Sequence, residues 1–211
     1  NPGPAFYMNK LAVPPPARDV IDLDASPEEN LKAIAKALGK DVDDLTVFVL
    51  DKPRHKDLIA HIRKAGARIQ LHTDGDVAGA LMAVLPDTGV DVMMGTGGTP
   101  EGVLAAAAIK VVGGEMLGRL DPQSTAERDA LLKAGYDLHR VLSTGDLVRS
   151  DDVFFAATGI SGGDFLPGVR FTGRGAVTHS LVMRGKTGTV RRIEAFHSFA
   201  QLMRISAISY D

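Results

Sequence analysis

The sequence predicts an α/β protein with a mixed, largely parallel sheet flanked by helices and a β-rich antiparallel end. Between residues 45 and 112, short apolar runs alternate three times with longer segments of helical character, the order that parallel sheets require. The first of these runs, 45–50, is continuously apolar and rich in β-branched residues, as in strands buried on both faces. After residue 150, apolar runs are separated by glycine-rich turns, which predicts antiparallel strands.

The predicted helices begin and end at recognisable residues. Residues 26–29 form a capping box with proline at the first helical position, and apolar residues then recur at helical spacing until Gly39. The next helix carries an apolar stripe within 58–62 and ends at Gly66. Later helices are expected at 77–85, 99–112 and 126–134.

The other strands are expected at 68–71, 90–94, 115–120, 153–157, 168–171, 177–183 and 189–195. Residues 1–18 contain five prolines and are expected to be extended, with a short ordered piece at 6–8. We expect the strands after residue 150 to extend the same sheet within one domain. Right-handed crossovers place the carboxyl ends of parallel strands at one edge, where ligands bind.

The composition indicates a soluble globular protein. The 211 residues are 45% hydrophobic and 24% charged, with a net charge of -2, so we expect neither nucleic acid nor a membrane as a partner. There are no cysteines, which leaves oxygen or imidazole ligands for any metal and favours a hard cation. Neither a signal peptide nor a membrane span is recognisable, and the chain starts at Asn1. We expect a cytoplasmic protein and the later part of a longer chain.

Two cations follow the first predicted strand. Lys52 and Arg54 flank Pro53, whose fixed φ helps to hold both cations toward the same edge of the sheet. Two anchored cations suit a phosphate group. A solvated basic turn is the alternative interpretation.

Two acids follow the second strand. Asp74 and Asp76 are separated by Gly75, and in an extended turn they can bind two sugar hydroxyls or share a hard cation. An aspartate before a helix is also a common N-cap, an alternative that explains Asp76 more easily than Asp74.

Residues 95–102 are expected to form a ligand-binding turn between a strand and a helix. Thr99 is expected as the N-cap, with Pro100 at the first helical position and Glu101 in the first turn, at the positive end of the helix dipole. The glycines, Gly98 among them, allow a phosphate, a sugar or a metal to approach the backbone. An ordinary glycine-rich turn with a carboxylate placed only for the dipole is the alternative.

Other familiar motifs fail on their context. Gly185-Lys186-Thr187 resembles the end of a phosphate-binding loop, but Ser180 replaces the required glycine and strands flank the segment. Residues 159–163 fit the letters of a nucleophile elbow, yet glycines and a proline follow where a helix must begin. The 95–102 turn has Pro100 at the third glycine position of a dinucleotide fingerprint. The six histidines form no metal-spaced pair.

Several segments in order carry a resemblance to a known family. They are residues 7–10, 50–55, 73–79, 95–102 and 180–184. Together they are similar to class II fructose-1,6-bisphosphatase, of the metal-dependent, lithium-sensitive sugar phosphatases. The resemblance implies a layered α/β/α/β/α fold and hydrolysis of the 1-phosphate of fructose 1,6-bisphosphate in gluconeogenesis, by a water that Mg²⁺ or Mn²⁺ activates.

The resemblance also implies roles for single residues. It assigns to substrate binding Tyr7, Lys52, Pro53, Arg54, Asp74, Gly75, Asp76 and Gly98. Within this set, Lys52 and Arg54 would bind phosphate. Asp74 and Asp76 would bind sugar hydroxyls, and the Gly98 amide would bind a ligand oxygen. Glu101 matches a metal ligand. We also expect a homo-oligomer.

The chain departs from the family pattern in places. Asn9 stands where the family has an acidic residue, and Pro14 where it usually has glycine. The family's amino-terminal half, with its further acidic metal ligands and an Asp-Pro-[Ile/Leu]-[Glu/Asp]-Gly-Thr motif, has no counterpart here. We therefore interpret residues 1–211 as a carboxyl-terminal substrate-binding domain, with a pocket but no complete catalytic centre.

Three alternatives stay open at this point. The chain can be a sugar-phosphate-binding module without turnover, or part of an inositol-type or nucleotide-type phosphatase of the same superfamily. Sedoheptulose 1,7-bisphosphate, which some photosynthetic relatives accept, is a further candidate substrate.

Overall fold

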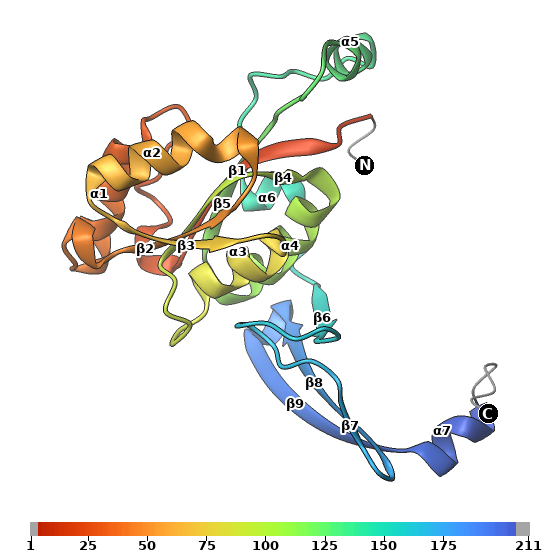
Figure 1. Ribbon diagram of the computed structural model, residues 1–211. Helices are drawn as coiled ribbons and strands as arrows, with labels where there is room; N and C mark the ends of the chain where they lie inside the picture. The colour runs from red at the N-terminus through yellow and green to blue at the C-terminus, as the bar shows by residue number, and fades with distance from the viewer. Residues whose placement is uncertain (1–3, 206–211) are drawn as a thin grey trace. The chain divides into compact units, whose positions relative to one another are not determined.

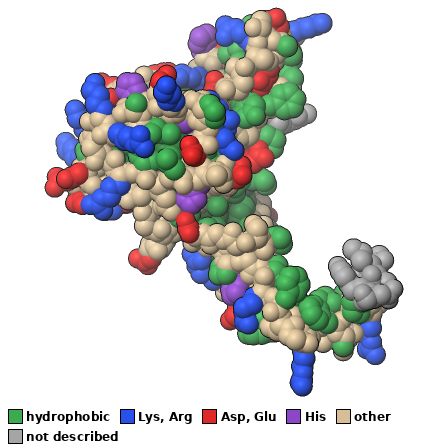
Figure 2. All heavy atoms as spheres, viewed as in Figure 1, with side chains coloured by type: hydrophobic (Ala, Val, Ile, Leu, Met, Phe, Trp, Pro, Cys, Tyr) green, Lys and Arg blue, Asp and Glu red, His purple; other side chains and the backbone are tan. Residues whose placement is uncertain are grey.

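The structure, a computed structural model, describes residues 4–205. The chain divides into two compact units, Asn1–Asp151 and Asp152–Asp211 (Figure 1). None of the helices within residues 4–205 combines the length and apolar character needed to cross a membrane. On the face seen in Figure 2, acidic and basic side chains are interspersed over the first unit.

The first unit is built on a five-stranded sheet. Its strands are β1 (Tyr7–Val13), β2 (Thr46–Leu50), β3 (Arg68–His72), β4 (Val92–Gly98) and β5 (Glu115–Leu120), in the order β3-β2-β4-β1-β5. β2 pairs in parallel with β3 and β4, whereas β1 lies antiparallel to both β4 and β5. Four strands therefore run in one direction, which confirms the mixed, largely parallel sheet.

β1 corrects the expectation for the amino-terminal residues. The sequence predicts an extended segment with a short ordered piece at 6–8, but Tyr7–Val13 is a full strand between β4 and β5. Its last four residues, from Lys10 to Val13, are all buried. The sequence does not predict this central strand because Lys10 interrupts its apolar run. In the structure that lysine is nevertheless buried.

The helices of the first unit follow the predicted pattern closely, except that the sequence does not predict the short helix Thr144–Leu147. They are α1 (Pro27–Leu38), α2 (Lys56–Ala65), α3 (Asp76–Val84), α4 (Thr99–Val112), α5 (Thr125–Lys133) and α6 (Thr144–Leu147), with 3₁₀ turns η1 (Pro15–Ala17), η2 (Val42–Asp44) and η3 (Pro53–His55). The capping box of α1 is confirmed, because Ser26 and Glu29 cap each other, and Gly39 ends the helix at a φ of 65°.

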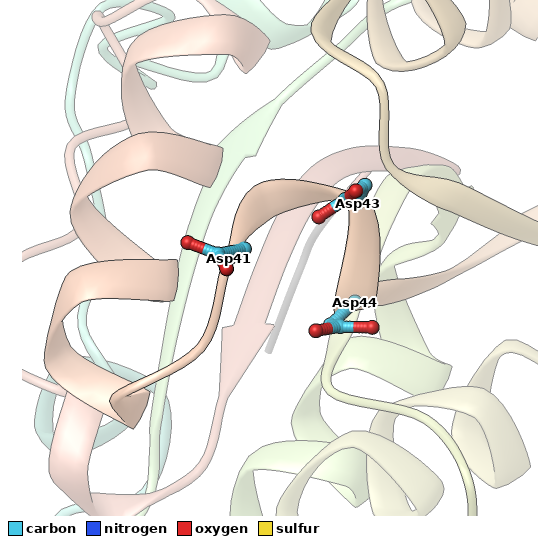
Figure 3. Close-up of side chains that lie close together, drawn as sticks. All are labelled: Asp41, Asp43 and Asp44. Atoms are coloured by element: carbon cyan, nitrogen blue, oxygen red, sulfur yellow. The ribbon is translucent and has the colours of Figure 1, made fainter.

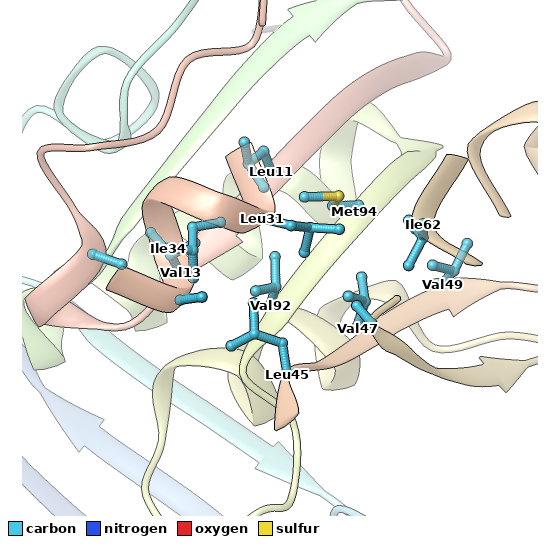
Figure 4. Close-up of a cluster of buried hydrophobic side chains, with 13 residues drawn as sticks. Leu11, Val13, Leu31, Ile34, Leu45, Val47, Val49, Ile62, Val92 and Met94 are labelled. Atoms are coloured by element: carbon cyan, nitrogen blue, oxygen red, sulfur yellow. The ribbon is translucent and has the colours of Figure 1, made fainter. Parts of the chain in front are cut away.

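The helices cover both faces of the sheet. On one face, α1 and α2 pack on the core cluster that Figure 4 shows. Its labelled members are Leu11, Val13, Leu31, Ile34, Leu45, Val47, Val49, Ile62, Val92 and Met94. On the other face, Gly79 of α3 lies against the Phe48 ring, and Gly102 of α4 lies against Met8 and Lys10. The alternating residues of β1 and β2 thus point to two different helical layers.

The second unit is an antiparallel sheet. It contains β6 (Phe154–Thr158), β7 (Arg170–Thr172), β8 (Gly175–Arg184) and β9 (Thr189–Ser198), followed by α7 (Phe199–Ile205), with the 3₁₀ turn η4 (Gly185–Thr187) between β8 and β9. β8 pairs with each of the other three strands. The antiparallel prediction is confirmed, but the expectation that these strands extend the first sheet is wrong. β8 and β9 satisfy each other's backbone over ten residue pairs, so the hairpin forms a sheet of its own.

The close contact between Gly79 and Phe48 allows a test of how α3 packs on the sheet. A Cβ at this position would lie 2.3 Å from the Phe48 ring. We expect Gly79→Ala to lower the free energy of unfolding, because overpacking costs about 1–3 kcal/mol whereas alanine gains only about 1 kcal/mol of helix propensity. Chemical denaturation measures the difference.

Gly145→Ala is the matched control. Gly145 is also helical, and its added Cβ would meet the Ser143 hydroxyl at an ordinary 3.6 Å. Equal stability changes for the two variants would contradict the packing described for α3.

Candidate functional site

One pocket lies where the predicted loops end. It has a volume of about 530 Å³ and is bordered by the carboxyl ends of β2 and β4 and by the starts of β1, α3 and α4. The predicted residues that line it are Tyr7, Lys52, Arg54, Asp74, Gly75, Asp76, Gly98 and Glu101. Pro53 does not line the pocket; it is the first residue of η3, between the two cations. The structure therefore brings three segments to one edge of the sheet. They are a first loop after β2 (51–54), a second loop after β3 (73–76) and, as the third, the junction of β4 and α4 (97–101).

Tyr7 reaches this edge because β1 is antiparallel. It lies opposite Gly98 in the register of β1 and β4, so the beginning of β1 meets the end of β4. The Arg54 guanidinium lies over the Tyr7 ring, 5.1 Å from its centroid, and the Arg54 Nε donates to the Thr96 carbonyl at 2.9 Å. Two contacts from different strands thus orient this cation.

Lys52 and Asp74 form a link between the first and second loops. Lys52 Nζ lies 3.3 Å from Asp74 Oδ1. Because the Asp74 side chain is 86% exposed, this ion pair contributes little to stability, and both groups stay accessible to a ligand.

His55, one of the six histidines that form no metal-spaced pair, is buried, and here it fixes the first loop. Its Nε2 accepts a hydrogen bond from the Thr96 amide at 2.8 Å, so the proton is assigned to Nδ1, which donates to the Leu50 carbonyl at 2.7 Å. Burial lowers the pKa of His55 below 6.5, and the charge of Arg54 acts in the same direction. The ring is therefore neutral at neutral pH.

Gly95 is needed for this contact. Its φ is +130°, and a Cβ there would lie 2.9 Å from His55 Nε2. Residues 95–98 belong to β4, so the expected turn between a strand and a helix is wrong. The glycines extend the strand because β1 pairs with them and neighbouring side chains occupy the space beside them.

Asp76 is not the N-cap of α3. Gly75 takes that position with a φ of 93°, and Asp76 is the first helical residue. Asp76 is buried and its Oδ2 lies 2.5 Å from Nζ of Lys10, a residue that sequence reasoning did not select. Burial lowers the pKa of Lys10, while Asp76 and Glu101 oppose that shift.

Glu101 and Gly98 lie together at the start of α4. Gly98, and not Thr99, is the N-cap, and Glu101 is in the first turn as predicted. A Cβ at Gly98 would lie 1.8 Å from a Glu101 carboxylate oxygen, so only glycine fits beside this carboxylate in its present position. Glu101 is exposed at the pocket and next to the free amides of the helix start.

A larger hollow of about 720 Å³ lies at the other end of the strands. Both of its cations are already paired, with Lys40 Nζ 2.6 Å from Asp91 and Arg68 Nη2 2.7 Å from Asp44. Figure 3 shows Asp41, Asp43 and Asp44 nearby, before β2 begins. All three of these aspartates are exposed, and nothing beside their own clustering indicates a bound ion. The pocket at the carboxyl ends is the better candidate, because it combines accessible cations and acids.

Comparison with known proteins adds the family. The family described as bacterial fructose-1,6-bisphosphatase, glpX-encoded, matches residues 1–197. The chain belongs to this family. It is 42% identical over 215 residues to the fructose-1,6-bisphosphatase class 2 of Haemophilus influenzae, covering 96% of this chain and 65% of that protein.

Two further relatives are each 43% identical over 207 residues, or 92% of this chain. They are the D-fructose 1,6-bisphosphatase class 2/sedoheptulose 1,7-bisphosphatase of a Synechococcus species and the fructose-1,6-bisphosphatase 1 class 2 of Escherichia coli K12. The matches cover 60% and 62% of those proteins. The chain thus spans less than two thirds of the length of these relatives.

The pocket of this fructose-1,6-bisphosphatase family chain does not form a complete metal centre from its described residues. Glu101 and Asp74 offer accessible carboxylates, but Asp76 is buried and held by Lys10. A hard divalent cation takes about six oxygen ligands. Among residues 4–205, the group of three carboxylates that lie close enough to hold one ion is the one before β2, and the pocket has no such group.

The neutral state of His55 predicts a pH dependence of stability. The unfolded chain takes up the His55 proton near pH 6.5, whereas the folded chain does so only at lower pH. The stability from neutral His55 is therefore fully present above pH 6.5 and is lost as the pH falls through the lowered pKa. We expect the free energy of unfolding to fall more steeply on acidification in the wild type than in His55→Gln.

Denaturation midpoints between about pH 7 and pH 5 measure this difference, and His61→Gln is the control. His61 is exposed and contacts Glu28 on α1. If His55→Gln and the wild type follow parallel pH profiles, the buried neutral histidine is not the source of the dependence.

Proposed function

We propose that this chain is the substrate-binding part of a class 2 fructose-1,6-bisphosphatase, a hydrolase that converts fructose 1,6-bisphosphate to fructose 6-phosphate and phosphate in gluconeogenesis. The observation that carries the proposal is the convergence of two cations, two aspartates and a helix-start carboxylate on one pocket. The names of the relatives support the choice of substrate.

In this proposal, Lys52 and Arg54 bind a phosphate of the substrate. Their positive charges border the same pocket, and Pro53 lies between them in a 3₁₀ turn that fixes the backbone. The Arg54 side chain is oriented by Tyr7 and Thr96 before any ligand arrives, which reduces the entropy lost on binding.

Asp74 and Asp76, which line the same pocket, bind sugar hydroxyls. Hydroxyl groups donate to carboxylates, and Gly75 between the two acids keeps the backbone open to the sugar. The Gly98 amide, next to the start of α4, binds a further ligand oxygen.

Glu101 is one ligand of a divalent cation, Mg²⁺ or Mn²⁺, whose chemistry in this proposal is the activation of a water molecule. In this proposal the remaining oxygen ligands come from a further part of the whole protein, since the chain spans less than two thirds of the length of its relatives. The chain by itself therefore binds substrate without complete turnover. We further propose a cytoplasmic location and a homo-oligomeric assembly.

Two alternatives differ in their support. A binding module without turnover is favoured by the incomplete metal centre of the described residues. Sedoheptulose 1,7-bisphosphate is a second candidate substrate, because the Synechococcus relative carries that activity in its name. The relatives named above give no support to an inositol-type phosphatase.

Substitution of Arg54 tests the phosphate role. We expect Arg54→Met to weaken fructose 1,6-bisphosphate binding by about ten- to a hundredfold, because hydrogen bonds to charged groups contribute about 1.5–3 kcal/mol. Titration calorimetry on the chain measures the affinity. Lys56→Met is the control, since Lys56 is an exposed cation two residues away that does not line the pocket. Equal losses in both variants would indicate a general charge effect instead of a site.

Substitution of Glu101 tests the metal role in the full-length product of the gene. We expect Glu101→Gln to abolish phosphate release from fructose 1,6-bisphosphate with Mg²⁺ or Mn²⁺, while metal-free binding of the sugar bisphosphate is retained. A colorimetric phosphate assay measures release. Asp43→Asn, an exposed carboxylate at the other end of β2, is the control. Full activity of Glu101→Gln would exclude the metal role, and no release even from the wild type would favour the binding module.

A further inference from the structure

Lys10 is a buried charged residue to which none of the roles described above applies. It lies on β1, between β4 and β5, and only 2% of its surface is exposed. A buried ammonium group is costly unless it is paired and hydrogen-bonded. Its position next to the pocket therefore requires an explanation from its contacts.

The ammonium of Lys10 contacts two different loops. Nζ lies 2.5 Å from Asp76 Oδ2 and donates to the Gly98 carbonyl at 2.6 Å. Asp76 begins α3 and Gly98 caps α4, and both residues line the pocket. One side chain thus joins the second loop to the third.

The surrounding glycines make this arrangement possible. A Cβ at Gly97 would lie 2.1 Å from Asp76 Oδ2 and 3.2 Å from Lys10 Nζ. A Cβ at Gly102 would lie 3.1 Å from Lys10 Cε. Glycines on both β4 and α4 therefore leave the space in which the lysine and the aspartate meet.

We propose that Lys10 is a positioning residue of the sugar-binding side of the pocket, a role that rests on the proposed function. Its ammonium fixes the orientation of the Asp76 carboxylate and the position of the Gly98 backbone. Through Gly98 it also sets the start of α4, where Glu101 lies beside that glycine. Lys10 acts through these groups and does not itself contact the substrate.

The contacts of Lys10 predict a selective effect on ligands. The cations Lys52 and Arg54 are held by other partners, namely Asp74, Tyr7 and Thr96. Loss of the Lys10 ammonium therefore frees the Asp76 carboxylate and the Gly98 backbone but leaves the phosphate-binding cations in place. A merely structural role would instead affect both sets of groups.

Calorimetry with two probes separates these roles. On the chain, we expect Lys10→Met to weaken fructose 1,6-bisphosphate binding by about tenfold or more, as for misplaced positioning groups. We expect inorganic phosphate binding to change by less than about threefold, because the contacts that orient Lys52 and Arg54 do not involve Lys10. Circular dichroism establishes that the variant is folded.

Two further variants complete the experiment. Lys40→Met is the matched control, because it removes an ammonium that is 2.6 Å from Asp91 at the other end of the sheet, and we expect wild-type affinities for both probes. If Lys10→Met does not fold, Lys10→Gln replaces it, since its amide still donates a hydrogen bond without a charge. We expect the same selective loss with Lys10→Gln.

The outcomes distinguish the two proposals. Wild-type affinity for fructose 1,6-bisphosphate in the folded Lys10 variant overturns the positioning role alone. A proportional loss of both probes in a folded variant also overturns it, in favour of a structural role. Failure of the wild type to bind fructose 1,6-bisphosphate overturns the proposed function and, with it, the role of Lys10.

Discussion

The antiparallel pairing of β1 with β4 is the constraint on which the site depends. Without β1, the sheet would end at β4, and β5 would have no partner strand. The opposite direction of β1 places its first residue, Tyr7, beside the last residue of β4, Gly98. Backbone bonds secure this end, because the Thr99 amide donates to the Phe6 carbonyl and the Asp121 amide to the Tyr7 carbonyl. The strand order thus places both the Tyr7 ring and the buried ammonium of Lys10 at the same edge of the sheet.

Buried polar contacts then fix the individual loops. His55 connects the first loop to the Thr96 amide of β4, and Lys10 connects the second loop to the third. Each contact lies in the interior, where an unmade hydrogen bond costs more than at the surface. Each also needs glycine in β4, because a Cβ at position 95 or 97 would occupy the space of the partner side chain. The glycine-rich segment therefore serves the interior contacts as much as it serves a ligand.

The sequence predicts the pocket-facing residues well because one rule governs them. Polar residues after parallel strands gather at one edge, and Lys52, Asp74 and Glu101 all follow this rule. Lys10 breaks the apolar pattern of β1, so periodicity gives no signal for a buried strand there. From the sequence, the glycines of β4 predict a turn, because glycine weakens strands. Pairing with the neighbouring strand β1 explains why they remain extended. Antiparallel patterning likewise does not reveal which sheet a strand joins, as the separate sheet around β8 demonstrates.

The long chain separation of the contacting residues has a consequence for folding. Lys10 meets Asp76 across 66 positions and Gly98 across 88, and His55 meets Thr96 across 41. Contacts between distant positions form only after the entropy of closing large loops has been overcome, so they belong to the slow steps of chain collapse. The pocket therefore becomes able to bind a ligand late in folding, when the sheet is complete. A nascent chain that still lacks β4 does not form part of the pocket in advance.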